Sequence, residues 1–492
     1  MAWREYHEFT KHSFDSLRRS PHYLDWANMP NPFRHYDGVP LLDLPADPPE
    51  PDIPALEVLA GKAGTTEARD GAAFLSQLLF YSASISASKR VSSTGSTYAL
   101  RVNPSSGNLH PTEFHFCTRG LVGWPDGLYH YRSASHMAEQ RATGDFASRI
   151  TDTDAPVVFL LSSIAWRESW KYRERAYRYC LHDIGHAWQS LVLVAGAMGC
   201  GSAAVGQFND DQVSSACLLN EDEWPMLIVG LRGSVIPIEP HPKQDNHIYG
   251  GQPNRLSDEQ ILYDRIVQIH AATKIQGTVP VSMCDAAEMN GRGEIPLPIA
   301  ACSKLAFGEV VRKRRSALNF RGGEESMTPS QLSALLRSTS EPMLADFARQ
   351  RLVDLYIYVH RVEGMAPGVY RFWPEPAELE KIKDGDQRVV AARLSLGQEL
   401  AGNACVAFSM IGDFERAERG YGERGYRYVH FVAGAIGQCM YIAAEALGLR
   451  ATGIGAFYDE EVHQYLGVAP EQSQVVYHFA VGHPVADLRL EA

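Results

Sequence analysis

The sequence predicts a protein of mixed α and β structure, built from two tandem copies of one domain that pack together as an internal pseudo-dimer. Three observations support this prediction. A helix-like segment recurs 249 residues later, short β-branched runs flank both occurrences, and a stretch rich in Pro, Gly and Asn separates the two halves. The chain has 492 residues, which is enough for two to three domains of ordinary size.

The recurring segment carries most of this argument. Residues 171–208 are echoed by residues 420–457, and 15 of the 42 ungapped positions from 172 to 213 are identical to their partners, where composition alone gives roughly three. Two shorter echoes follow the same order: 127–131 with 368–372, and 226–230 with 478–482. A period this long indicates a duplicated domain rather than a solenoid.

Each copy of the segment is predicted to form one long apolar helix entered through Tyr-Arg-Tyr. Gly185 and Gln189 lie four residues apart on one face, as do Gly434 and Gln438 in the second copy. A glycine on that face allows another helix to approach closely. A helix this apolar must be covered on nearly all sides, so we expect the two copies to pack helix against helix. The alternative is two copies held apart by the linker.

The predicted strands and domain boundaries follow from composition. Strands are expected at 157–163, 226–231, 355–362, 406–413 and 475–482. Residues 236–256 are rich in Pro, Gly and Asn, which marks a linker, and a short amphipathic pattern follows it. We therefore expect a first domain over 1–240, a linker and connecting segment over 241–300, and a second domain over 301–492.

Composition excludes several classes of protein. The content of 45% apolar and 21% charged residues is ordinary for a globular chain. The net charge is −12 and no long basic run occurs, so a nucleic-acid partner is not expected. The sequence has no stretch apolar enough to span a membrane, which favours a soluble, cytoplasmic protein. Eight scattered cysteines without a CxxC pair argue against a disulfide framework and against a metal site.

Two segments carry candidate binding groups, and each occurs in one copy only. The first copy has the loop Asn103-Pro104-Ser105-Ser106-Gly107-Asn108, whose hydroxyl, carboxamide and backbone groups can hydrogen-bond a planar polar ring. The alternative is a turn whose serine caps the next helix. The second copy has Arg312-Lys313-Arg314-Arg315-Ser316, which suits a phosphate, and Arg489 is a further cation that could join it. The alternative is a solvated basic face at a helix end.

The position just before the shared helix also differs between the copies. The first copy has Lys171-Tyr172, whereas the second has Gly420-Tyr421. A lysine kept in one copy and lost in the other suggests one working site and one relic. Lysine and tyrosine in water titrate near 10, so either would need a lowered pKa to act as a base. The alternative is a surface lysine beside a core tyrosine.

Taken together, these motifs resemble the FMN-dependent nitroreductase superfamily, and within it the SagB-type (ThcOx) dehydrogenases, here as a tandem fusion. The resemblance implies a central, mostly antiparallel sheet flanked by helices in each copy, with FMN at the interface between copies. It assigns phosphate binding to Arg314, Arg315, Ser316 and Arg489. It assigns contacts with the flavin ring to Pro104, Ser105, Ser106 and Asn108, and to the turn containing Gly455 and Ala456, whose backbone approaches the N5 edge.

Departures from the family pattern affect the number of working sites. Leu318 stands where a further basic residue is usual. The stretch Pro30–Tyr36, which we expect to be the first copy's equivalent of the phosphate segment, keeps only Arg34. The second copy lacks the PSSGN loop. We therefore expect one composite site per chain and a second interface that binds flavin weakly or not at all.

The resemblance implies oxidation of a thiazoline or oxazoline ring, or a similar C–N bond, in a peptide-derived substrate, with Lys171 and Tyr172 beside the flavin. The flavin carries the redox chemistry. Two alternatives remain at this stage. One is an NAD(P)H-dependent nitro- or flavin reductase acting on a small molecule, and the other is a non-catalytic flavin- or peptide-binding scaffold. The sequence leaves open whether the pseudo-dimer associates further.

Overall fold

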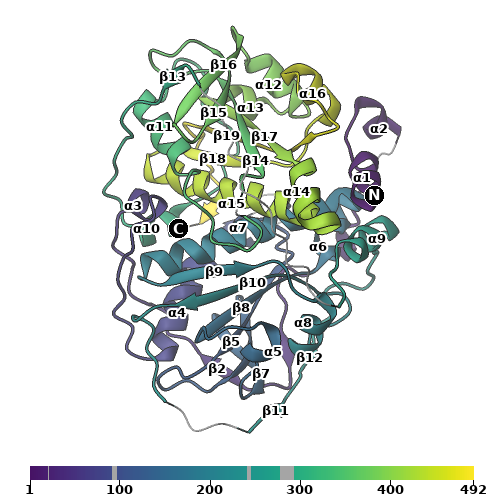
Figure 1. The fold of residues 1–492 in the computed structure, drawn as a ribbon, viewed down its shortest axis with the longest axis vertical. Helices are drawn as coiled ribbons and strands as arrows, with labels where there is room; N and C mark the ends of the chain where they lie inside the picture. Colours follow the sequence, from purple (N-terminus) through teal and green to yellow (C-terminus); the bar gives the residue numbers. More distant parts are fainter. Residues whose placement is uncertain (20–21, 91–96, 241–244, 278–292, 349, 492) are drawn as a thin grey trace.

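The computed structural model describes residues 1–19, 22–90, 97–240, 245–277, 293–348 and 350–491. Its two halves each contain a large sheet, and two long helices lie between the sheets at the centre of the molecule (Figure 1). One apolar core takes buried residues from both halves. The two copies therefore form an internal pseudo-dimer, and the alternative of copies held apart is excluded.

The helices of the first half are α1 (Ala2–Phe9), α2 (Phe14–Arg19), α3 (Ala55–Leu59), α4 (Gly71–Ser82), α5 (Ala147–Ile150), α6 (Ala165–Tyr172), α7 (Ala176–Ala197) and α8 (Asp210–Ala216), with short 3-10 turns η1 (Trp26–Asn28), η2 (Ser106–Asn108) and η3 (Arg173–Arg175). Those of the second half are α9 (Asp264–Ala272), α10 (Phe307–Lys313), α11 (Pro329–Arg337), α12 (Arg388–Leu394), α13 (Glu399–Asn403), α14 (Phe414–Tyr421), α15 (Gly425–Ala446) and α16 (Asp459–Leu466), with η4 (Gly422–Arg424).

The strands of the first half are β1 (Tyr36–Asp37), β2 (Leu41–Asp43), β3 (Ile85–Arg90), β4 (Thr97–Arg101), β5 (Thr112–Thr118), β6 (Gly127–Arg132), β7 (Met137–Thr143), β8 (Val157–Ser163), β9 (Gly201–Val205), β10 (Trp224–Arg232), β11 (His247–Ile248) and β12 (Gln252–Pro253). Those of the second half are β13 (Ile295–Pro296), β14 (Val353–Val359), β15 (Gly368–Trp373), β16 (Glu378–Asp384), β17 (Val406–Asp413), β18 (Arg450–Ile454), β19 (Ser473–Gly482) and β20 (Leu490–Glu491).

The two large sheets share one topology. The first has the order β11-β7-β6-β5-β8-β10-β9, with β2 beside β7, and the second has the order β13-β16-β15-β14-β17-β19-β18. Neighbouring strands in both sheets pair antiparallel, as expected from the sequence. The matching register confirms the duplication, since β6 and β15 contain the two copies of the shorter echo.

Helices α7 and α15 cross at their matching glycines. A Cβ added to Gly185 would lie 2.9 Å from the Cα of Gly434, and one added to Gly434 would lie 3.0 Å from the Cα of Gly185. Such contacts are too short for any side chain, so the absence of a Cβ at both positions sets the distance between the helices. The predicted close helix approach is confirmed.

Helices α1 and α9 make matching contacts in the two halves. In the first half, Arg178 donates to the carbonyl oxygen of His7 (2.6 Å) and to the hydroxyl of Thr10 (3.0 Å). In the second half, Arg427 donates to the carbonyl oxygen of His270 (3.2 Å) and to a threonine hydroxyl (2.8 Å). We propose that the second copy begins with α9, inside the segment that the sequence suggested as linker and connection.

The structure also bears on the expectations about cysteines, membrane segments and metal sites. Seven of the eight cysteines are described and all seven are free; six are buried and Cys302 is exposed. Cys284 lies outside the described residues. No helix in the described parts of the chain is both long and apolar enough to cross a membrane. The described residues also contain no cluster of His, Cys, Asp and Glu side chains suited to hold a metal ion.

Candidate functional site

A cavity of about 770 Å³ lies between the two copies, and both of them line it. Its volume is in the range of pockets that bind cofactor-sized molecules, roughly 300–1,000 Å³. Every predicted cofactor-binding residue lines it: Pro104, Ser105, Ser106, Asn108, Arg314, Arg315, Ser316, Gly455, Ala456 and Arg489. Tyr172 lines it as well. Lys171 is not part of the wall, but its Nζ lies 5.2 Å from the centre of the Tyr172 ring.

The basic end of the cavity is built where α10 stops. The helix ends at Lys313, so the next residues leave the helix and turn toward the first copy. Arg314 is buried and donates to the carbonyl oxygens of Val102 (3.0 Å) and Arg101 (3.2 Å). Its Nη1 is buried without a partner among the described residues. A buried guanidinium nitrogen with no acceptor is costly unless a ligand supplies one.

Arg315 and Ser316 complete this end. Burial, together with the charges of Arg314 and Arg312, lowers the pKa of Arg315 to about 10. The crowding of positive charge that lowers this pKa is relieved when an anion binds among these groups. The Ser316 hydroxyl lies 2.8 Å from that of Tyr441, which places two hydroxyl groups in the cavity wall at this end.

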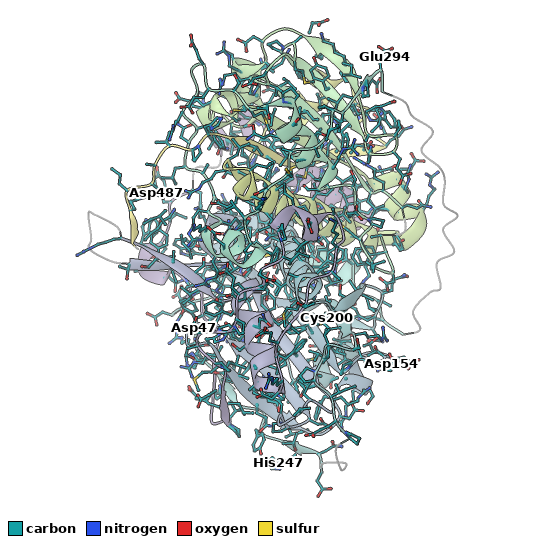
Figure 2. All side chains as sticks on the ribbon, turned by 90° about the vertical axis from the view of Figure 1, so that its left-hand side faces the viewer. Asp47, Asp154, Cys200, His247, Glu294 and Asp487 are labelled. Atoms are coloured by element: carbon teal, nitrogen blue, oxygen red, sulfur yellow. The ribbon has the colours of Figure 1, made fainter. Side chains whose placement is uncertain are left out.

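Arg489 lies directly before the C-terminal strand β20, which pairs with β3. Its Nε donates to Asp487 at 2.9 Å, and Lys89 binds the same carboxylate at 2.7 Å. The hydrogen bond from Arg489 holds the pKa of Asp487 well below its ordinary value. Asp487 lies where the two halves meet at the edge of the molecule (Figure 2). Arg489 therefore lies in the cavity wall, but Asp487 already neutralises part of its charge.

The PSSGN loop forms another part of the cavity wall. Gly107 has a φ of +59°, and a Cβ there would lie 2.7 Å from the Tyr172 hydroxyl and 3.1 Å from Lys171 Nζ. Glycine adopts this positive φ without strain, and a Cβ here would force the ends of the Tyr172 and Lys171 side chains to move. The Asn108 side chain donates to the carbonyl oxygen of Ala99 (2.9 Å), so this amide fixes the loop to β4.

The turn after β18 forms a third wall. The Gly455 carbonyl oxygen accepts from the Tyr179 hydroxyl (3.0 Å) and from Arg175 Nη2 (3.3 Å). A Cβ on Gly455 would lie 2.8 Å from Cδ1 of Tyr179. Among the described residues, no oxygen accepts a hydrogen bond from the amide of Gly455 or Ala456. This wall therefore presents backbone donors that no described residue accepts.

The two predicted catalytic residues differ in what their surroundings allow. Burial raises the pKa of Tyr172 well above its ordinary value, and neighbouring carboxyl groups add to the effect. This is the opposite of the lowered pKa that a base requires, so Tyr172 stays protonated and is not suited to act as the base. The structure describes no carboxylate in an ion pair with Lys171, which leaves its Nζ facing Gly107 and Tyr172. Of the two, Lys171 is the candidate base.

Sequence reasoning missed two carboxyl groups behind the PSSGN loop. Asp183 of α7 accepts hydrogen bonds from Ser105 Oγ (2.6 Å), Ser106 Oγ (3.0 Å) and the Ser106 amide (3.1 Å). Glu168 of α6 lies next to it and is fully buried. The repeat contained the signal for both: their partners 249 residues later are Ala417 and Val432, so the carboxyls, like Lys171, occur in one copy only.

The second interface contains a smaller cavity of about 350 Å³. Its wall includes residues that come directly after α3 in the chain. The start of α3 and the start of α10 exchange backbone hydrogen bonds: Ala55 N donates to Leu305 O (3.0 Å), and Phe307 N donates to Ile53 O (2.8 Å). Residues 61–63 therefore stand where the second copy has its arginines, with Lys62 as the cation of this segment. In the first copy, the β3–β4 hairpin and the PSSGN loop come before β5. In the described part of the second copy, no such hairpin or loop lies between α11 and β14.

The expected equivalence of Pro30–Tyr36 with the phosphate segment is wrong. Arg34 is buried and forms an ion pair with Asp222 at 2.6 Å, so its charge is used inside the first domain. The structural counterpart is the end of α3, which carries little sequence likeness to the end of α10. The backbone hydrogen bonds between the starts of α3 and α10, rather than residue identity, identify the two helix ends as equivalent.

The residues present fit a phosphate-bearing cofactor with a flat polar ring. The basic end offers a buried, unpartnered nitrogen of Arg314, and the turn wall offers the unpaired amides of Gly455 and Ala456. The PSSGN loop lines the same cavity, and its Ser105 and Ser106 hydroxyls donate to Asp183. The donors of the basic end and of the turn wall, in a cavity that tyrosine side chains also line, match what FMN requires.

A model of the nitroreductase family matches both halves, over residues 90–233 and 311–483. The chain belongs to the nitroreductase family. The crystal structure of a protein from Anabaena variabilis ATCC 29413, assigned to the nitroreductases, superposes with a TM-score of 0.78 at 25% identity. That match covers 98% of this chain and 99% of the other. Membership in this family indicates an oxidoreductase.

Two curated relatives of this nitroreductase-family chain match shorter regions. A nitroreductase of Methanocaldococcus jannaschii is 34% identical over 116 residues, which is 24% of this chain and 59% of the relative. The Microcin B17-processing protein McbC of Escherichia coli is 29% identical over 150 residues, which is 27% of this chain and 54% of McbC. The chain thus spans little more than half the length of these relatives.

Proposed function

We propose that this protein is an FMN-dependent dehydrogenase with one working site per chain. The observation that carries the proposal is the large cavity in which the basic end of the second copy meets the PSSGN loop of the first. The described residues that line the cavity at the second interface include neither the arginines nor the loop. Phosphate affinity and ring contacts therefore come from different copies, and only one of the two combinations is complete.

The substrate we propose is a thiazoline or oxazoline ring, or a similar C–N bond, in a modified peptide, as in the SagB-type dehydrogenases. Support comes from the Lys171–Tyr172 pair beside the loop and from the likeness to McbC, a protein that processes microcin B17. When bound, FMN supplies a two-electron acceptor for hydride, and dioxygen can serve as the terminal oxidant.

The chain's own residues would bind, orient and move one proton. Arg314, Arg315 and Ser316 would hold the phosphate, while Ser105 and Ser106 would face the ring. Lys171 would take the proton that leaves the carbon next to nitrogen as hydride leaves the ring being oxidised. Tyr172, whose pKa is raised by burial, would keep its proton and donate a hydrogen bond to the substrate.

The test has two parts. The purified protein is denatured and the FMN released per chain is measured, with one FMN per chain expected and two per chain contradicting the single composite site. The holoprotein is then incubated under air with a peptide containing a thiazoline, and loss of two mass units from the ring is followed. Turnover of NADPH with a nitroarene, without oxidation of the thiazoline, would instead identify a reductase. Absence of FMN after reconstitution would identify a scaffold.

A further inference from the structure

Asp183 is the anchor of the loop that faces the cavity. It is buried on α7, and its two oxygens accept from the hydroxyls of Ser105 and Ser106 and from the Ser106 amide. The same Ser105 hydroxyl accepts from the amide of His110 (2.8 Å), which closes the loop. Three donors directed at one carboxyl group favour its ionised form. The position of the loop therefore depends on the charge of Asp183.

Glu168 lies beside this anchor, where the nearby Ser105 hydroxyl already donates its proton to Asp183. It is fully buried on α6, one turn before Lys171, and neither of its oxygens has a hydrogen-bonded partner among the described residues. Burial, followed by the charge of Asp183, raises its pKa well above the ordinary value, and Lys171 only partly opposes this. An ionised carboxylate without donors is costly in such a site, whereas a protonated acid that donates to Asp183 is not.

Glu168 and Asp183 occur only in the copy that has the PSSGN loop. In the second copy, the same two helices have Ala417 and Val432 at the equivalent positions, and both are accommodated without carboxyl groups. The helix pair therefore does not need Glu168 and Asp183 in order to fold. Their presence beside Lys171 and the PSSGN loop points to a role in the site itself.

We propose that Glu168 is a neutral acid that shares its proton with the Asp183 carboxylate, and that this pair positions the PSSGN loop against the bound flavin. The proposal rests on the FMN site proposed above. The pair thus fixes the position of the loop in the cavity wall.

Several other titratable groups face the pair from the surrounding elements. They are Lys171 and Tyr172 on α6, Tyr179 and Cys180 on α7, and Tyr477 on β19. Burial raises the pKa of the four neutral groups among them, so they do not ionise near neutral pH. Burial also raises the pKa of Asp183, to about 7, against the opposing hydrogen bonds from the two serines. A second proton therefore enters the pair as the pH falls through this range.

The experiment compares Asp183→Asn with Glu168→Gln. The asparagine cannot accept all three loop donors as a carboxylate does, so FMN should bind about 10- to 100-fold more weakly. The glutamine is neutral and still donates to Asp183, so its FMN dissociation constant should stay within about twofold of wild type. Flavin fluorescence titration measures both. Wild type should bind FMN more weakly below about pH 6 than at about pH 8, and Asp183→Asn should lose this dependence.

A second measurement on the FMN-free protein separates this proposal from the FMN site. Amide hydrogen exchange of the peptide covering residues 103–110 is followed in each variant at one pH. Exchange should be faster in Asp183→Asn and unchanged in Glu168→Gln. If Glu168→Gln loosens the loop as much as Asp183→Asn, Glu168 acts as a carboxylate and the proposal is overturned. Equal exchange and equal FMN affinity in all three proteins would overturn it as well. Failure of wild type to bind FMN, with the exchange pattern as expected, would reject only the FMN site.

Discussion

Asp210 and Asp459, 249 residues apart, each bind two arginines of the other copy of the domain. Asp459 accepts from Arg175 (3.0 Å) and Arg178 (2.8 Å) of the first copy. Asp210 accepts from the matching pair, Arg424 and Arg427, of the second copy. These groups are buried, so each copy supplies the counter-charge for the other. The reciprocal ion pairs fix the orientation of the two copies around the crossing of α7 and α15.

Removing either aspartate should destabilise the fold by a similar amount. Asp459→Asn or Asp210→Asn leaves two buried guanidinium groups without a full counter-charge, which costs about 3–5 kcal/mol of unfolding free energy. Urea denaturation measures this. The two variants should differ in FMN binding, because Arg175 also donates to the Gly455 carbonyl in the cavity wall. Asp459→Asn should weaken FMN binding, whereas equal weakening in Asp210→Asn would contradict the single-site proposal.

The same ion pairs predict how stability depends on acid. Burial by itself raises the pKa of Asp459, but the charges of Arg175 and Arg178 outweigh it and lower the pKa from 3.8 to about 2. The folded state thus binds fewer protons than the unfolded state between these values, so its stabilisation is present above about pH 4 and is lost as the pH falls toward 2. The loss should be about 2–3 kcal/mol. Urea midpoints across this range should fall more steeply in wild type than in Asp459→Asn.

The helix crossing should tolerate no added methyl group. Gly434→Ala would place a Cβ against the Cα of Gly185, and the two backbones would have to separate, which costs about 1–3 kcal/mol or more. Gly196→Ala is the matched control on α7, since a Cβ there meets nothing within 4 Å. It should be neutral or stabilise by up to about 1 kcal/mol through helix propensity. Thermal unfolding of both variants tests the difference, and equal melting temperatures would reject the close crossing.

Much of the fold was predictable because duplication repeats the same physical pattern twice. The apolar strands at 157–163 and 406–413 coincide with β8 and β17, and the long helix is found as α7 and α15. The repeat also located the glycines at the crossing. In the site, residues that occur in one copy only, such as Lys171, were predicted as functional because the other copy has a different residue at the same position. All of these signals lie in contiguous segments of the sequence.

What could not be predicted depends on contacts between distant segments. The equivalence of α3 with α10 is set by reciprocal backbone hydrogen bonds near Ala55 and Phe307, which leave no trace in side-chain identity. The role of Asp183 depends on a loop 77 residues earlier folding back onto α7. Comparison of the two copies shows that Glu168 and Asp183 occur in one copy only. Their burial and the hydrogen bonds to Asp183 were needed to connect them with the PSSGN loop.

Lys171→Ala and Tyr172→Phe should separate chemistry from cofactor binding. Neither side chain belongs to the basic end of the cavity, so both variants should keep FMN at the wild-type level. Loss of a positioned proton acceptor lowers turnover by roughly 10²- to 10⁴-fold, and this is expected for Lys171→Ala. Tyr172→Phe removes a donor rather than a base and should have a smaller effect. Azoline oxidation per bound FMN is the measurement, and unchanged turnover in Lys171→Ala would contradict its assignment as the base.

Arg314→Ala tests whether the phosphate is held at the end of α10. The side chain is buried and no described residue accepts from its Nη1, so its loss removes a charge-assisted hydrogen bond that a ligand can accept. FMN affinity should fall by about 10- to 100-fold. Riboflavin has no phosphate, so its affinity should change little. Lys62→Ala alters the matching segment after α3 at the second cavity and should leave FMN affinity unchanged. Equal losses of FMN in the two variants, or equal losses of FMN and riboflavin in Arg314→Ala, would place the phosphate elsewhere.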